Sequence, residues 1–241
     1  MKKILLLFYI LLIYYNQNFA QNNDSLIFKN FVYQYKCEFI STNNTKTNEH
    51  LILKKLNTKW KFDEKQQAIE YSYSPDTIGL KTFVNPVIGW RKRMEKYQPW
   101  QWTKKEVTGL FENENFLWQH PPRSNQYIYC QIAPFPEVKF KKLFIDSVWN
   151  SSLTILGGIP KRGEFKGIVN SKFKVISKDT FLLNGEIIPN CWKIEAIGIH
   201  SRLGENKLTF IFNKDLGIIE YDYRFYDGTR LLIHLERISN D

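Results

Sequence analysis

The sequence predicts a mainly β protein whose antiparallel sheet curves into a half-open or closed barrel, with few short helices; a sandwich of two sheets is the alternative. Two observations support this fold class. Apolar and polar residues alternate in short runs that turn residues separate roughly every ten positions, as in antiparallel strands with one buried face. Aromatic residues make up 16% of the chain, and so broad an apolar surface is covered either by closing the sheet or by packing an element across it.

The chain begins with the layout of a secretory signal peptide. Two lysines precede an apolar run from Ile4 to Tyr15, and a polar stretch then ends at Ala20. The run is about 12 residues long, whereas a membrane-spanning helix needs roughly 20. We therefore expect cleavage after Ala20, a signal peptide over 1–20 and a single β-rich domain over 21–241. No cysteine follows the cut for a lipid anchor and no later segment is apolar for long enough to span a membrane, so we expect an exported protein of the periplasm or cell surface.

The first predicted strands form a hairpin. Phe31 to Phe39 alternates large apolar side chains with polar ones, and His50 to Leu56 returns after a polar turn. The segment from Asp63 to Ile69 fits either a turn or a short helix, and Ser74-Pro75-Asp76 then interrupts the chain. Prolines punctuate the region from Phe83 to Val138, at positions 86, 99, 121, 122, 134 and 136. Ordered loops and short strands are expected there, because proline excludes helix interiors.

The C-terminal half predicts a meander. Two strands are expected first, over Phe165 to Ile176 and Thr180 to Leu183, with a tight turn at Asn184-Gly185. Four further strands follow, over Cys191 to Ala196, Leu208 to Phe212, Ile219 to Phe225 and Leu231 to Leu235. Asp227-Gly228 suits the positive φ values of a hairpin turn between the last two. Sequential strands joined by such turns usually pair.

Charge and cysteine content restrict the partners only loosely. The chain has 34 Lys and Arg against 24 Asp and Glu, an excess that attracts anionic partners or reflects a lysine-rich genome composition. Export argues against nucleic acid. The three cysteines, Cys37, Cys130 and Cys191, are widely spaced. They permit one disulfide and a leftover thiol, or three buried thiols.

The segment Leu117-Trp118-Gln119-His120-Pro121-Pro122-Arg123 is the first candidate site. Consecutive prolines fix φ and keep the preceding residue extended, so His120 and Arg123 lie on a stiff segment. Beside Trp118 they would form a polar site, in which the guanidinium holds a carboxylate or phosphate. In the structural alternative, Trp118 is core, the prolines end a strand and Arg123 pairs with a neighbouring acid.

A second candidate surface runs from Trp90 to Lys105, where basic and aromatic residues alternate. Its candidate ligand-binding residues are Trp90, Arg91, Arg93, Tyr97, Trp100 and Trp102. Aromatic faces and cations together suit a glycan or a membrane interface. The alternative is an exposed loop with its tryptophans anchored in the core.

Two resemblances accompany these motifs. The LWQHPPR segment followed by Pro134-Phe135-Pro136 resembles a pattern in uncharacterised exported β-rich proteins of Gram-negative bacteria, over about residues 110–140. That resemblance implies export and a shared fold, and no particular activity. The order of strands is distantly similar to the periplasmic lipoprotein-carrier half-barrels, in which a curved sheet shelters lipid chains. No motif of theirs is matched, and fold alone does not determine function.

No signature of an enzyme, a metal site or a cofactor site occurs in the sequence. We therefore expect no metal and no cofactor, and a non-enzymatic envelope protein that binds an apolar or amphipathic ligand, lipid-like or glycan, or that docks an envelope protein. One alternative is a hydrolase of envelope polymer that uses His120, Arg123 and an acid. Another is a subunit of a surface assembly.

Overall fold

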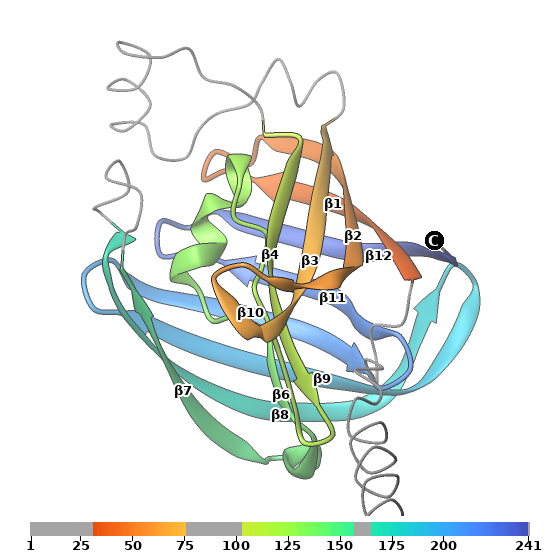
Figure 1. Ribbon diagram of the computed structural model, residues 1–241. Coiled ribbons are helices and arrows are strands. Elements are labelled where there is room, and N and C mark those ends of the chain that lie inside the picture. Colours follow the sequence, from red (N-terminus) through yellow and green to blue (C-terminus); the bar gives the residue numbers. More distant parts are fainter. Residues whose placement is uncertain (1–30, 76–102, 157–164, 241) are drawn as a thin grey trace, which may run out of the picture.

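The fold is a single curled sheet, seen in a computed structural model that describes residues 31–75, 103–156 and 165–240. The sheet has 12 strands and curves into a half-barrel (Figure 1), which confirms the predicted fold class over the two-sheet alternative. The strands are β1 Phe31–Ile40, β2 Lys46–Trp60, β3 Asp63–Pro75, β4 Lys105–Asn113, β5 Phe116–Gln119, β6 Glu137–Lys139, β7 Val148–Ile155, β8 Gly167–Leu183, β9 Glu186–His200, β10 Gly204–Asn213, β11 Gly217–Arg224 and β12 Arg230–Asn240. Two 3-10 helices are described, η1 Asn125–Ile132 and η2 Phe140–Lys142.

The strand order is that of a ring opened at one place. Along the sheet it runs β6-β5-β4-β3-β2-β1-β12-β11-β10-β9-β8-β7, and the pairs are antiparallel. Apart from β6 and β7, consecutive strands pair with each other, and β1 also pairs with β12. Among the described strands, β6 and β7 are the consecutive pair that does not bond, and they are the two ends of the sheet. We call the opening between these two ends the seam.

The inner face of the sheet is apolar and rich in tyrosine. Every second side chain of a strand points to the inner face. Along β8, Val169, Phe173 and Val175 are therefore buried while their neighbours in the sequence are exposed. Tyr221 and Tyr223 of β11 are also buried, with their rings stacked at 6.3 Å between centroids. The hydrophobic core therefore fills the concave side of the sheet.

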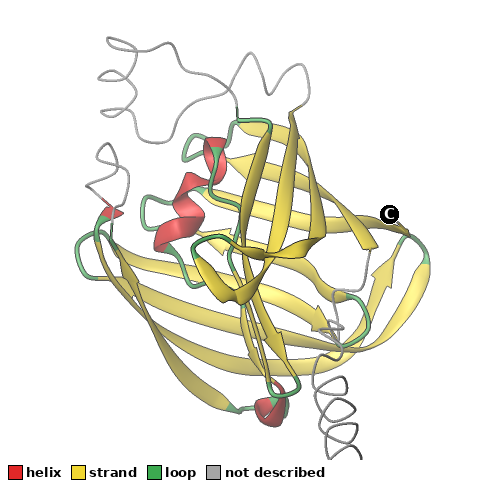
Figure 2. Cartoon of the chain, viewed as in Figure 1, coloured by secondary structure: helices red, strands yellow, loops and turns green. Residues whose placement is uncertain are grey.

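A helix and its flanking loop cover part of this concave side. Figure 2 shows η1 lying against the sheet, and its Tyr127, Ile128 and Ile132 are buried. The Tyr127 ring packs against that of Tyr73 at 5.2 Å. The Asn206 amide donates a hydrogen bond of 3.0 Å to the Ile132 carbonyl, which ties the end of η1 to β10.

Three local predictions need correction. Asp63 to Ile69 belongs to β3 and is neither a turn nor a helix, because hydrogen bonding to β2 and β4 on both sides overrides its polar composition. The two strands expected over 165–183 form one strand, β8, which absorbs its polar middle in register shifts after Val175 and Asp179. At the last hairpin, Gly228 has φ +85° and Asp227 has no positive φ; the Asp227 carboxylate instead accepts the Thr229 amide at 3.0 Å.

The other turn and the cysteines agree with what the sequence allowed. Asn184 and Gly185 have φ values of 50° and 85°, the positive pair that a tight hairpin demands. Cys37, Cys130 and Cys191 are all free and buried, so the disulfide alternative is not realised. Within the described residues, no helix is both long enough and apolar enough to cross a membrane.

We predict opposite effects for two buried tyrosines. The Tyr35 hydroxyl donates to the Ile218 carbonyl at 3.0 Å, joining β1 to β11 across β12, so Tyr35→Phe should lower the free energy of unfolding by about 1 kcal/mol. The Tyr223 hydroxyl is buried and has no partner among the described residues, so Tyr223→Phe should be neutral or stabilising. Urea unfolding of both variants measures this, and equal destabilisation would contradict it.

Candidate functional site

A partly open pocket of about 680 Å³ lies at the seam. One end of the sheet contributes Leu153 and Ile155 of β7, followed by Leu156. The opposite wall consists of Glu106 and Val107 of β4 and residues of the segment that follows β5. The pocket therefore lies between β7, one end of the sheet, and a wall made by β4 and the segment after β5, and it has no lining residue from β6.

His120 stands in a cage of aromatic rings beside this pocket. Its imidazole lies 4.9 Å from Trp60, 4.6 Å from Trp118 and 5.3 Å from Phe135 between ring centroids. The His120 backbone is held at both ends, because its N–H donates to Gly109 and its carbonyl accepts the Tyr71 hydroxyl at 2.8 Å. The ring is thus placed by the fold and not by a polar partner of its own.

The cage keeps His120 uncharged. Burial, followed by the charge of Arg123, lowers the pKa of His120 to about 3 against the opposing effect of Asp63. The residue is 8% exposed, and its Nδ1 has no partner in the described part of the chain. At neutral pH the imidazole is therefore a neutral member of an aromatic wall.

Glycine at position 109 makes room for the cage. A Cβ there would overlap the Gln66 side chain and the Trp60 ring. Since a strand glycine often marks such a close approach, Gly109 is what allows Trp60 to lie across β4 toward His120.

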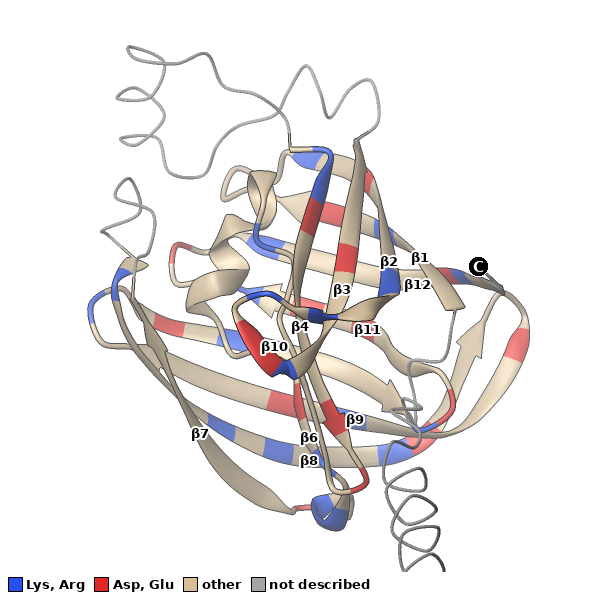
Figure 3. Cartoon of the chain, in the orientation of Figure 1, with Lys and Arg blue, Asp and Glu red and all other residues tan. Residues whose placement is uncertain are grey.

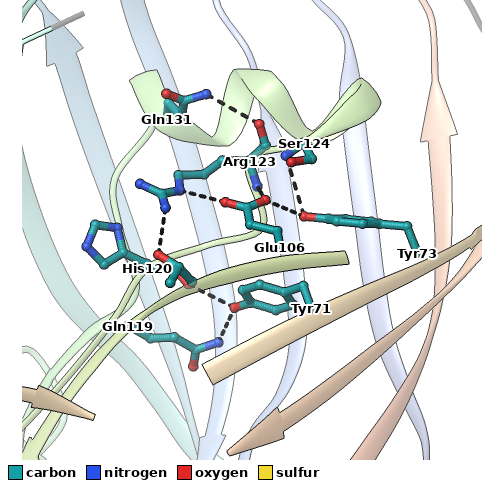
Figure 4. A network of polar contacts seen from close by, with 9 residues as sticks. Tyr71, Tyr73, Glu106, Gln119, His120, Arg123, Ser124 and Gln131 are labelled. Carbon is teal, nitrogen blue, oxygen red and sulfur yellow. Dashed lines mark hydrogen bonds and ion pairs between the residues drawn. The ribbon is translucent and has the colours of Figure 1, made fainter. Parts of the chain in front are cut away.

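Arg123 is fixed by Glu106 in a network shown in Figure 4. The Arg123 Nε donates to Glu106 at 2.9 Å, its backbone N–H donates to the same carboxylate at 3.0 Å, and its Nη2 donates to Thr108 at 2.7 Å. The Tyr73 hydroxyl donates to Glu106 at 2.6 Å, and burial followed by the Glu106 charge raises the pKa of Tyr73. The Arg123 side chain remains 24% exposed, and its Nη1 has no partner among the described residues.

A second chain of hydrogen bonds joins the back of the site to the core. The Gln119 amide donates to the Tyr71 hydroxyl at 2.6 Å, and the Tyr221 hydroxyl donates to the Gln119 carbonyl at 3.4 Å. These contacts link β3, β5 and β11, so the segment that carries His120 is anchored to the sheet interior.

The structure brings together part of what the sequence indicated. His120 and Arg123 line one pocket, whereas Trp118 packs behind His120 and does not line it. Arg123 also pairs with an acid and the prolines follow the end of β5, as in the structural alternative. The six residues of the second candidate surface, Trp90, Arg91, Arg93, Tyr97, Trp100 and Trp102, lie outside the described residues.

Sequence reasoning missed the rest of the lining. Trp60 and Phe62 flank a turn and could have been noticed as an aromatic pair, with ring centroids 5.4 Å apart. Glu106, Leu153 and Ile155 carried no signal, because nothing local distinguishes them from other strand residues. In the described ranges, no three His, Cys, Asp or Glu side chains group as a metal site would require.

Comparisons with known proteins give little beyond this geometry. No family model matches the sequence, and no curated protein matches it. Among solved structures, the chain is similar to the hypothetical lipoprotein YmcC from Escherichia coli K12, with 8% identity, a TM-score of 0.35 and coverage of 90% of each chain.

We predict that His120 makes folding sensitive to mild acid. Since the folded pKa is about 3 and the ordinary value is 6.5, the unfolded chain binds the proton first and stability is lost as pH falls below about 6.5. The loss should reach about 2 kcal/mol at pH 5. The free energy of unfolding of His120→Phe, measured with denaturant at neutral pH and at pH 5, should fall less than that of the wild type by this amount.

His50→Gln is the matched control, because the His50 side chain is 61% exposed. It should follow the wild-type pH profile. A His120→Phe variant with the same pH dependence as the wild type would show that the cage does not hold the imidazole neutral.

Proposed function

We propose that the protein is an exported envelope protein that binds an apolar or amphipathic ligand in the seam pocket. The observation that carries this proposal is the pocket itself, about 680 Å³ in volume, with mostly apolar walls and a few polar groups at one side. Small-molecule sites have this size and this mixture. The signal-peptide layout of residues 1–20 supports export to the periplasm or cell surface.

Exposed apolar side chains at the pocket support an apolar ligand. Leu156 is 77% exposed, Phe62 is 72% exposed and Val107 is 47% exposed, and all three line this pocket. Burial of apolar surface stabilises a protein or complex by about 25 cal/mol per Å², and this gain is absent while the surface faces water. Clustered exposed apolar groups often mark binding sites. A bound apolar chain would cover them.

Arg123 supports a polar group at one end of that ligand. Its Nη1 is the unused donor of a guanidinium that Glu106 and Thr108 hold in place. Because Glu106 compensates the charge, a carbonyl, hydroxyl, carboxylate or phosphate oxygen could accept from Nη1. The lining therefore suits an amphipathic ligand, and a lipid-like molecule is the first candidate.

The geometry favours binding over hydrolysis. A general base works best with a pKa near the working pH, whereas the pKa of His120 is about 3. Its Nδ1 meets no carboxylate in the described part of the molecule, and Arg123 is engaged by Glu106. The aromatic-basic stretch from Trp90 to Trp102 remains a second proposed surface, for a glycan or an envelope protein.

Blocking the pocket should weaken the binding of an amphipathic probe. We expect saturable fluorescence enhancement of 8-anilino-1-naphthalenesulfonate by the folded protein, with weaker binding of N-phenyl-1-naphthylamine, which lacks the sulfonate. Val107→Trp fills the pocket from an exposed position and should weaken the affinity about tenfold or more, equivalent to 1.4 kcal/mol. Fluorescence titration measures both probes.

Val148→Trp is the matched control, because Val148 is also a strand valine, 38% exposed, and does not line the pocket. It should bind both probes as the wild type does. Equal loss in both variants, or no saturable binding to protein whose thermal unfolding remains cooperative, would refute the pocket proposal.

Export has its own test. Expressed with its leader in a Gram-negative host, the protein should be recovered from the envelope fraction beginning at Gln21. The intact mass measured by mass spectrometry identifies the cut, and a retained leader would contradict the proposed address.

A further inference from the structure

The two edges of the sheet are protected very differently. The β6 edge is three residues long, includes Glu137 and Lys139, and follows Pro136. The β7 edge runs for eight residues with the sequence VWNSSLTI. It has no charged residue, no proline and no register shift against β8. Natural proteins usually protect an edge of that length with one of these features.

The free side of β7 presents a row of backbone donors and acceptors. Ser147 accepts the Val175 N–H at 3.0 Å, and residues of an antiparallel strand bond alternately to one side and the other. Odd-numbered residues therefore bond to β8, and Val148, Asn150, Ser152 and Thr154 direct their N–H and C=O groups away from it. These four residues are exposed, and no backbone partner for them exists among the described residues.

The surroundings of this edge are basic. Exposed lysines surround β7 without an ion-pair partner in the described part of the chain, namely Lys141, Lys142, Lys166 and Lys172. The nearby acid, Asp146, is paired with Lys174 at 2.8 Å. Figure 3 shows basic positions along β8 and in η2, next to β7. The net charge of the whole chain is +10, which opposes edge-to-edge pairing of two copies.

We propose that β7 accepts an extended, acidic segment of a partner polypeptide as an additional strand. Backbone hydrogen bonds to Val148, Asn150, Ser152 and Thr154 would supply the affinity, as in other cases of strand addition. Carboxylates of the segment would lie near Lys172 and its basic neighbours, which supplies the preference for acid. The proposal needs no ligand in the seam pocket, because it rests on backbone groups and surface charge; of its four residues, Thr154 also lines that pocket.

The test uses peptides as long as β7. The probe alternates threonine with glutamate, and its two controls alternate threonine with lysine or place proline at every second position. Fluorescence anisotropy should show saturable binding of the acidic peptide, with at least about tenfold weaker binding of each control. Hydrogen exchange should slow at the β7 amides when the acidic peptide is present.

Two variants locate the contact. Ser152→Pro removes an N–H that does not bond to β8, so it should preserve the fold and abolish peptide binding. Should that variant fail to unfold cooperatively, Lys172→Glu takes its place and should weaken the acidic peptide about tenfold. Lys214→Glu makes the same charge change in the exposed turn after β10, three strands from β7 in the order of the sheet, and should bind as the wild type does.

Several outcomes would overturn the proposal. One is no binding of the acidic peptide. Another is equal binding of the acidic and basic peptides, and a third is binding that survives Ser152→Pro. A dimer in sedimentation that Ser152→Pro dissociates would assign the edge to a second copy. Lys172→Glu changes a residue that does not line the seam pocket, so it should leave binding of the two fluorescent probes unchanged, which separates this result from that of the seam pocket.

Discussion

The pairing of the first described strand with the last is the constraint on which the rest of the structure depends. Residues 31–40 of β1 bond to residues 230–240 of β12, so the first and last described strands meet in the middle of the sheet. Two meanders, β1 to β6 and β7 to β12, thereby become one surface. Such non-local pairing is costly in loop entropy and slow to form. Its effect is to move β6 and β7, neighbours in the chain, to opposite ends of the sheet.

The polar network follows from that arrangement. Where the two ends face each other, no hydrogen-bonded ladder satisfies the backbone, and a rigid segment after β5 lies in the gap. Side chains form hydrogen bonds with its polar groups instead. The Tyr71 hydroxyl donates to the His120 carbonyl, and the Glu106 carboxylate accepts from both the backbone N–H and the guanidinium of Arg123. A buried network of this kind is stabilising only when its members are satisfied, and Glu106 with three donors meets that condition.

The sequence was sufficient for strands whose burial follows a period of two. β1, β2 and β9 to β12 have that pattern, because one face is core and the other is water. It failed at β3, where Asp63 to Ile69 fits a turn or a short helix and only pairing on both sides makes a strand. It also assigned no strand to the uncharged, polar β7. His120 and Arg123 were found because proline stiffness is local, whereas Glu106 and Leu153 join them through contacts between strands that leave no local pattern.

One proline-rich segment bears on both the seam pocket and the free edge of β7. Pro134 and Pro136 precede β6 and cannot donate to a ladder, which limits β6 to three residues. A three-residue strand could cover only part of the eight residues of β7, and the two strands do not bond, so β7 keeps a free side. The same segment contributes Phe135 to the cage around His120. The open pocket and the unpaired edge therefore both involve this one segment.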